Sequence, residues 1–166
     1  LGVMFQAGAL FSSMTVGENV MLPLELNARA SAAQHERIAR EKLALVGLQD
    51  SFEQEPAALS GGMKKRAAIA RALALEPQVL FLDEPSAGLD PLASARLDAL
   101  ILQLRDQLGT TVVMVTHELD SLFAVADRVL FLSAEDKTLT AMGAPRELAD
   151  RGPEPVREFL HRGRAS

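Results

Sequence analysis

Two adjacent carboxylates, Asp83 and Glu84, directly follow the apolar run VLFL at residues 79–82. A continuous apolar run is typical of a strand buried on both faces of a parallel sheet, and such sheets bind their ligands beyond the carboxyl ends of the strands. One carboxylate could bind Mg²⁺, directly or through water, while the other activates a water molecule for attack on phosphorus. An acidic turn exposed to solvent would have the same sequence, so the pair alone leaves both interpretations open.

A single histidine, His117, takes the equivalent position after the next predicted strand, TVVMV at residues 111–115. Because the ends of neighbouring parallel strands converge, we expect His117 to lie near the acidic pair, where it could orient a water molecule or contact a γ-phosphate. A histidine at the end of a strand can equally be an ordinary polar residue. The other two histidines, His35 and His161, are predicted to lie on charged surface helices and are assigned no chemical role.

The segment LSGGMKKR at residues 59–66 has the features of a helix N-terminus that can bind an anion. Ser60 is a good N-cap residue, and Gly61 and Gly62 expose their backbone N–H groups without a side chain to block approach. The helix dipole and the basic side chains that follow add positive charge at this end. The predicted helix runs over residues 61–75 and ends before a Glu-Pro pair. A capped helix with a solvated basic face is the alternative interpretation.

The remaining elements are predicted from the periodicity of their apolar residues. Strands are expected over residues 1–5, 128–132 and 138–142, and helices over residues 16–26, 31–47, 91–108, 119–126, 145–149 and 155–161. The helix over residues 91–108 carries an apolar stripe of Leu97, Ile101, Leu104 and Leu108. From residue 79 onward strands and helices alternate, which indicates a parallel sheet with helices on its faces.

Composition limits the class of protein. The chain has 166 residues, 48% of them apolar, and its mean hydropathy is +0.11, which predicts one soluble globular domain. The net charge of −5 argues against a nucleic-acid partner, and the absence of cysteine excludes disulfides and thiolate metal sites. No apolar run is long enough to cross a membrane. The first residue is not methionine and the sequence opens like a strand, so we expect a fragment.

Taken together, the order and spacing of these motifs resemble those of an ABC-type ATPase, and the resemblance covers nearly the whole chain. It identifies Gln6 with the Q-loop glutamine, residues 59–63 with the signature motif, residues 80–83 with Walker B, Glu84 with the catalytic glutamate, residues 86–90 with the D-loop and His117 with the switch histidine. With Walker B and Glu84 counted as one motif, five motifs in register are far more specific than any of them alone.

Two longer stretches, FQAGALFSSMTVGENVMLPL and LSGGMKKRAAIARALALEPQVLFLDEPSAGLDP, resemble the ATPase subunits of Mla/Mce-type phospholipid transporters. These transporters are also described as organic-solvent-resistance or toluene-tolerance systems. Met63 stands where the general family has glutamine, and this change is characteristic of the subgroup. The resemblance therefore implies transport of phospholipid or another hydrophobic compound.

The resemblance also implies the fold, an α/β P-loop NTPase (RecA-like) core with a parallel sheet and an inserted α-helical subdomain. Residues 1–6 would form a core strand and the Q-loop, residues 7–75 the helical subdomain with the signature motif, and residues 76–166 the rest of the core. In the family the N-terminal strands and the Walker A lysine loop come before the glutamine that Gln6 matches, and this sequence lacks them. We therefore expect the chain as given to fold marginally and to be inactive by itself.

In the family, ATP and Mg²⁺ bind between two nucleotide-binding domains packed head to tail, so the resemblance implies a homodimer. Asp83 and Gln6 would bind the metal, Glu84 would polarise the attacking water with Gln6 close by, and His117 would contact the γ-phosphate. Ser60, Gly61, Gly62 and Met63 would act on the partner's nucleotide, and Asp90 would link the two sites. The subunit would be cytoplasmic and peripheral on the inner face of the cell membrane, bound to integral membrane permease subunits and, in Mce systems, to a lipid-binding protein.

Two other functions remain open. The first is a non-transport ABC ATPase, such as a translation factor with two tandem domains or a chromosome-maintenance protein with a long coiled-coil insertion. Only residues 7–58 separate the Q-loop from the signature here, which is too short for such a coiled coil. The second is a non-catalytic interaction module that only supplies a signature helix to a partner. The intact acidic pair and His117 argue against a degenerate parent gene.

Overall fold

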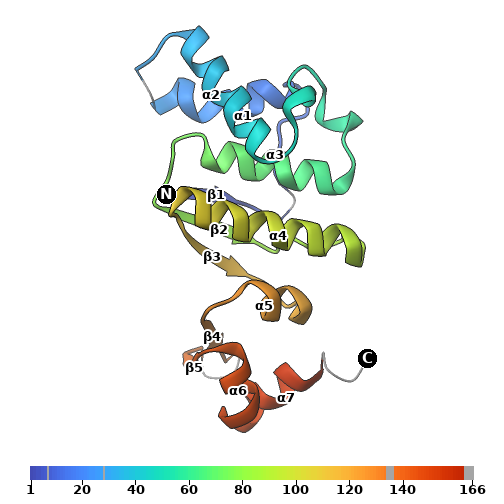
Figure 1. The fold of residues 1–166 in the computed structure, drawn as a ribbon, viewed down its shortest axis with the longest axis vertical. Helices are drawn as coiled ribbons and strands as arrows, with labels where there is room; N and C mark the ends of the chain where they lie inside the picture. The colour runs from blue at the N-terminus through green and yellow to red at the C-terminus, as the bar shows by residue number, and fades with distance from the viewer. Residues whose placement is uncertain (7, 28, 134–136, 163–166) are drawn as a thin grey trace. The chain divides into compact units, whose positions relative to one another are not determined.

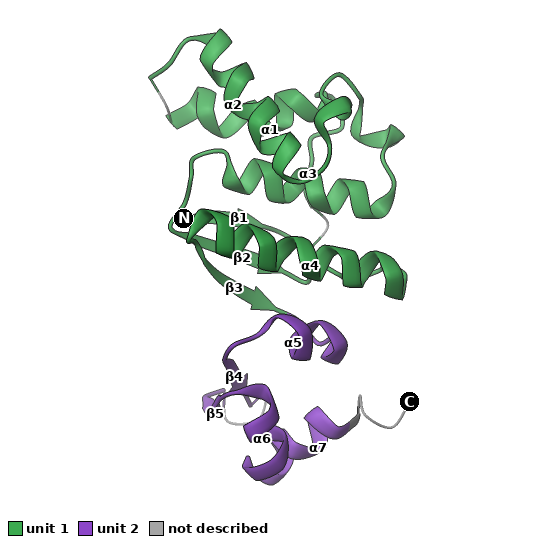
Figure 2. Cartoon of the chain, in the orientation of Figure 1, with its two compact units in different colours: residues 1–115 green, residues 116–166 purple. Residues whose placement is uncertain are grey.

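The computed structural model describes residues 1–6, 8–27, 29–133 and 137–162 (Figure 1). The chain divides into two compact units, Leu1–Val115 and Thr116–Ser166 (Figure 2). No helix within the described ranges is both long and apolar enough to cross a membrane.

The first unit contains a parallel sheet of three strands, β1 (Gly2–Met4), β2 (Val79–Asp83) and β3 (Thr111–Val115), with β2 in the middle. Side chains alternate along β2, so that Leu80 and Leu82 are each 1% exposed while Phe81 is 38% exposed. Our prediction that this strand is buried on both faces is therefore wrong for the described residues. An apolar run identifies a strand, but neighbouring elements decide which of its faces are covered.

Three helices pack together in the same unit: α1 (Val16–Asn27), α2 (Ala32–Leu45) and α3 (Gly61–Leu73). Between α2 and α3 the chain forms two short 3₁₀ turns, η1 (Gln49–Ser51) and η2 (Pro56–Ala58). Helix α3 also packs against β1 and β2, and it approaches β1 so closely that a Cβ on Gly2 would lie 2.3 Å from the carbonyl oxygen of Ala72. Helix α3 is thus the element that joins the helical part of this unit to its sheet (Figure 1).

The position of His35 differs from the prediction. Its side chain is 6% exposed, on the face of α2 that also buries Ala39, Lys42 and Leu43. These positions recur at helical spacing, so they share one face, and the packing partners of α2 bury that face whatever its polarity. Lys42 reaches out of the buried face, and its amine lies 2.8 Å from the Glu76 carboxylate.

Helix α4 (Pro91–Leu108) begins and ends where the sequence predicted. The Asp90 carboxylate caps it by accepting hydrogen bonds from the N–H groups of Leu92 and Ala93, at 3.1 and 3.0 Å. Gly109 ends it in the left-handed conformation, at φ 61°. The predicted apolar stripe is buried except at its last member, since Leu108 at the helix end is 40% exposed.

The second unit contains α5 (Leu119–Val125), β4 (Val129–Leu132), β5 (Leu139–Gly143), α6 (Pro145–Arg151) and α7 (Glu154–Arg162). We predicted that residues 128–132 extend the parallel sheet, and this is wrong: β4 pairs with β5 in an antiparallel ladder. A parallel crossover needs a dozen or more residues, whereas only residues 133–138 separate these strands. The apolar core of the unit includes Leu148 and Leu160, beside an edge-to-face contact between the Phe131 and Phe159 rings.

Candidate functional site

The N-terminus of α3 is capped and open. The Ser60 hydroxyl accepts a hydrogen bond from the Met63 N–H at 3.3 Å, which confirms the predicted N-cap. A Cβ on Gly62 would meet no described atom within 4 Å, and one on Gly61 would touch only the end of the Leu89 side chain, at 3.6 Å. The first N–H groups of the helix are therefore accessible to an anion, which the helix dipole favours at this end.

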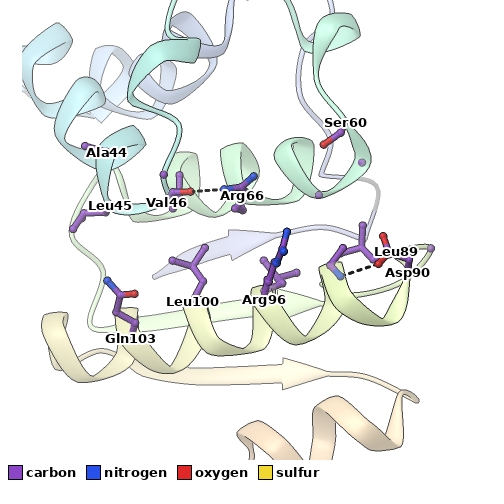
Figure 3. Close-up of a pocket in the computed structure, with 16 residues that line it drawn as sticks. Ala44, Leu45, Val46, Ser60, Arg66, Leu89, Asp90, Arg96, Leu100 and Gln103 are labelled. Carbon is purple, nitrogen blue, oxygen red and sulfur yellow. Dashed lines mark hydrogen bonds between the residues drawn. The ribbon is translucent and has the colours of Figure 1, made fainter.

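A cavity of about 690 Å³ lies beside this helix N-terminus (Figure 3). It is lined by the end of α2, the loop at residues 88–90 and one face of α4, so it brings Ser60, Gly61 and Gly62 together with Asp90. Arginines from two helices also line it. Arg66 of α3 donates a hydrogen bond to the Val46 carbonyl at 3.2 Å, and Arg96 extends from α4 toward α3. The cavity therefore combines the N-terminus of α3 with two arginines and the carboxylate of Asp90.

The acidic pair lies at the carboxyl end of the central strand, as the sequence predicted. Asp83 is the last residue of β2 and pairs in register with Val115 of β3. Glu84 follows in the left-handed region, with φ 46°, which is unusual for a residue other than glycine. Its N–H donates to the Val115 carbonyl at 2.9 Å, and its own carbonyl accepts from the Ala87 N–H at 3.2 Å. Backbone strain of this kind often marks a functional residue.

Gln6 lies at the same edge of the sheet. Strand β1 pairs in parallel with β2, with Met4 opposite Leu82. Gln6 comes just after the carboxyl end of β1, and Asp83 is the last residue of β2, so both lie at the same edge of the sheet. The Lys65 amine donates hydrogen bonds to the carbonyl of Gln6 and, at 3.1 Å, to the carbonyl of Glu84. The structure thus connects Gln6 with the acidic pair through a side chain of α3.

Lys65 is a residue that sequence reasoning missed. We counted it with the basic face of α3, yet it is only 8% exposed. Burial lowers the pKa of its amine below the usual value of 10.5, while the negative charges of Glu84 and then Asp83 act in the opposite direction. Two lysines in a row give no signal that distinguishes a buried amine from an exposed one, so only the packing of α3 on the sheet identifies Lys65.

His117 belongs to the second unit. Its Nε2 atom lies 3.8 Å from a carboxylate oxygen of Glu118, and its side chain is 68% exposed. The predicted proximity of His117 to Asp83 and Glu84 stays a prediction.

The described side chains can be compared with what Mg²⁺ and a nucleotide require. No group of three His, Cys, Asp or Glu side chains in the described ranges is arranged to hold a metal ion. Mg²⁺ is commonly held by one or two protein carboxylates together with water and phosphate oxygens. The Asp83 carboxylate and the Gln6 amide oxygen are donors of this hard type at the carboxyl ends of neighbouring strands, so they fit a metal whose remaining ligands come from phosphate and water.

The fold and these residues define a P-loop NTPase core of mixed α/β type, with a helical subdomain that carries a capped α3. The sequence pattern of the ABC transporter family matches residues 1–87, more than half of the 166 residues. The chain belongs to the ABC transporter family.

Its relatives include transport ATP-binding proteins. The chain is 42% identical over 161 residues to the probable ribonucleotide transport ATP-binding protein mkl of Mycobacterium tuberculosis H37Rv, covering 96% of this chain and 44% of that protein. It is 40% identical over 161 residues to the intermembrane phospholipid transport system ATP-binding protein MlaF of Escherichia coli K12, covering 96% of this chain and 59% of that protein. The chain thus spans about half the length of these curated relatives.

A solved structure shows the same fold. It is a dimeric, post-hydrolysis state of the ATP-binding cassette MJ0796 bound to ADP and Pi, and it matches with a TM-score of 0.74 at 32% identity. The match covers 86% of this chain and 62% of that one.

Proposed function

We propose that the full-length protein is the ATP-binding and ATP-hydrolysing subunit of an ABC transporter, which drives transport through a partner permease by ATP-dependent dimerisation. The observation that carries this proposal is the acidic pair at the carboxyl end of the central strand, in a chain that belongs to the ABC transporter family. The strained backbone of Glu84 supports a catalytic role for this residue. Such strain persists only where surrounding contacts hold it, and it is concentrated at functional sites.

In this proposal the acidic edge of the sheet performs the hydrolysis. Asp83 and Gln6 would hold Mg²⁺, which when bound neutralises charge on the phosphate oxygens. Glu84 accepts a hydrogen bond from the attacking water and so orients it toward the γ-phosphorus. His117 donates a hydrogen bond to the γ-phosphate. The water oxygen bonds to the γ-phosphorus as its proton passes to the Glu84 carboxylate, the bond between the γ-phosphorus and the bridging oxygen breaks, and ADP and phosphate leave.

The capped end of α3 serves the second subunit. Ser60, Gly61, Gly62 and Met63 meet the γ-phosphate of a nucleotide held by the partner, and Asp90 connects the two sites. The openness of the helix N-terminus supports this role, since Gly62 leaves room for an anion to reach the N–H groups. The phosphate that bridges two subunits holds them together, and its release on hydrolysis separates them. The likeness to a dimeric cassette bound to ADP and Pi also favours such a dimer.

The finer part of the proposal concerns the substrate and the partners. Met63 and the similarity to MlaF, at 40% identity, favour phospholipid or another hydrophobic compound, whereas mkl, at 42% identity, is named for ribonucleotides. The partners would be integral membrane permease subunits and an Mce-type lipid-binding protein, with this subunit cytoplasmic and peripheral on the inner membrane face. The subunit would have a core strand and the Q-loop at residues 1–6, the helical subdomain at residues 7–75 and the rest of the core at residues 76–166.

The decisive variant is Glu84→Gln in the full-length protein. Because the amide cannot take a proton from water, kcat for ATP should fall by about 10²- to 10⁴-fold. ATP binding and ATP-dependent dimerisation, measured by calorimetry and by size-exclusion chromatography with light scattering, should persist. The matched control Glu25→Gln changes an exposed glutamate of α1 and should keep wild-type turnover. Turnover by Glu84→Gln at close to the wild-type rate would overturn the proposal.

A further inference from the structure

A buried lysine of α3 joins the two strand ends that carry Gln6 and Glu84. The Lys65 amine donates hydrogen bonds to both backbone carbonyls, one on each strand end. Charged amines form stronger hydrogen bonds than neutral groups do, and burial weakens the competition from water. Lys65 therefore contributes to the placement of both residues, although its amine binds their main-chain atoms and not their side chains.

The backbone of Glu84 depends on such contacts. Its left-handed conformation, at φ 46°, is unfavourable for a residue with a Cβ. The Glu84 N–H donates a hydrogen bond to the Val115 carbonyl, which fixes the peptide group before Glu84. The Glu84 carbonyl accepts hydrogen bonds from Lys65 and Ala87, which fix the peptide group after Glu84. Backbone dihedrals set the direction of a side chain, so the bond from Lys65 helps to aim the Glu84 carboxylate.

The same helix holds the loop after β1 at a second place. Arg71 of α3 donates to the carbonyls of Gly8 and Ala9, at 2.8 and 2.7 Å. Gly8 and Ala9 both have positive φ, at 72° and 46°. Helix α3 therefore binds three carbonyls of this loop, those of Gln6, Gly8 and Ala9. Since a helix moves as a rigid element, displacement of α3 moves the loop with it.

We propose that Lys65 is a positioning residue that couples an anion bound at the N-terminus of α3 to the backbones of Gln6 and Glu84 in the same subunit. The inference rests on the proposed function, because that anion is the γ-phosphate of the nucleotide held by the partner subunit. Ser60 and Lys65 lie little more than one helical turn apart on one rigid helix. A phosphate drawn to the helix N-terminus shifts α3, and Lys65 transmits the shift to the subunit's own Glu84. In the dimer, the nucleotide at one site thereby sets the geometry of the other site.

The first experiment measures ATP turnover of the full-length dimer. Lys65→Met removes the amine and keeps an apolar stem of similar length, so kcat should fall by about 10- to 100-fold. KM for ATP should stay within about threefold, because Lys65 does not touch the nucleotide. Lys65→Arg keeps a charged donor and should recover part of the lost kcat, while Lys65→Gln, a neutral donor, should fall between the other two variants.

The matched control is Lys42→Met. Lys42 is as buried as Lys65, at 5% exposed, but its amine pairs with Glu76, and neither residue contacts Gln6 or Glu84 in the interactions described above. Lys42→Met should lower the melting temperature and leave kcat within about twofold of wild type. A fall in kcat that only follows the melting temperature in both variants would overturn the inference.

Mixed dimers separate the two roles of α3. One subunit carries Glu84→Gln, so that only the site served by the other subunit's Glu84 turns over. Lys65→Met should lower kcat when it is placed in the subunit that keeps Glu84. When it is placed in the Glu84→Gln subunit, whose α3 faces the nucleotide at the active site, kcat should stay unchanged. The opposite pattern would show that Lys65 only shapes the helix N-terminus, and would overturn the inference.

The outcomes also distinguish this inference from the proposed function. If Glu84→Gln abolishes turnover while Lys65→Met behaves like wild type, only the role of Lys65 fails. If Glu84→Gln turns over normally, the proposed function fails, and the inference fails with it. Should Lys65→Met not fold, Lys65→Gln in the same mixed dimers decides the question in the same way.

Discussion

Asn19 of α1 is a buried polar residue whose removal has a calculable effect. Its side chain is 0% exposed and makes four hydrogen bonds to the loop that precedes the helix. The carbonyl accepts from the Phe11 N–H at 2.7 Å, and the amide donates to the carbonyls of Phe11, Met14 and Thr15 at 3.0, 3.3 and 2.9 Å. Asn19 therefore holds residues 11–15, directly before α1, in one conformation.

The variant Asn19→Leu removes all four bonds with little change of side-chain shape. The Phe11 carbonyl still accepts a hydrogen bond from the Met14 N–H at 3.3 Å, and the Thr15 carbonyl still accepts one from the backbone N–H of residue 19 at 3.0 Å. The Phe11 N–H and the Met14 carbonyl lose the partner that Asn19 supplied. At about 1 kcal/mol for each net hydrogen bond, and more for a group left unsatisfied, we expect a loss of about 2–3 kcal/mol in the free energy of unfolding. In a domain of this size the melting temperature should fall by about 4–12 °C.

The assay is urea unfolding of the full-length protein followed by circular dichroism, with thermal melting as a second measurement. The matched control is Asn27→Leu, since the Asn27 amide makes a single exposed hydrogen bond to the Pro23 carbonyl at 2.9 Å. This control should lose less than about 0.5 kcal/mol. If Asn19→Leu and Asn27→Leu unfold at the same urea concentration, Asn19 does not organise the loop and the reasoning is refuted.

Two further predictions concern packing and charge. A Cβ at Gly17 would lie 2.5 Å from carbon atoms of the Phe52 ring, so Gly17→Ala should destabilise the protein by about 1–3 kcal/mol, and an unchanged melting temperature would show that the ring can move aside. Burial lowers the pKa of Lys65 in the native state, whereas in the unfolded state the amine keeps its usual value of 10.5. Between these two pKa values the unfolded chain binds more protons, so the stability of wild type relative to Lys65→Gln should rise with pH over that window. Urea unfolding of both proteins across alkaline pH tests this, and a flat or falling difference would contradict it.

Local sequence chemistry predicted much of the secondary structure. Ser60 and Asp90 cap α3 and α4 as expected, because a side-chain oxygen at an N-cap satisfies N–H groups of its own first turn. Gly109 ends α4 because its left-handed backbone suits glycine. The strands that end at Asp83 and before Thr116 were equally clear from their apolar runs. The resemblance to ABC ATPases, which rests on the order of such local motifs, is confirmed by the family match.

Predictions that depended on neighbours far along the chain were less accurate. The apolar run of β4 cannot indicate whether its partner is parallel or antiparallel, and the short connection to β5 decides this. The charged residues around His35 suggested an exposed helix, yet the packing of α1, α2 and α3 buries that face. Phe81 is partly exposed because the sheet face it occupies is not fully covered by the described residues.

The LSGG segment illustrates what each level of description determines. Its residue types alone specify a capped helix N-terminus that is open to an anion, because capping and glycine geometry depend on a few adjacent residues. They also suffice, with the downstream motifs, to recognise the family. Only the tertiary structure distinguishes Lys65 from its neighbour Lys64, since the packing of α3 against β1 and β2 brings the Lys65 amine to two carbonyls 59 and 19 residues away in the chain. Contacts over such separations depend on how whole elements pack, and no local pattern encodes them.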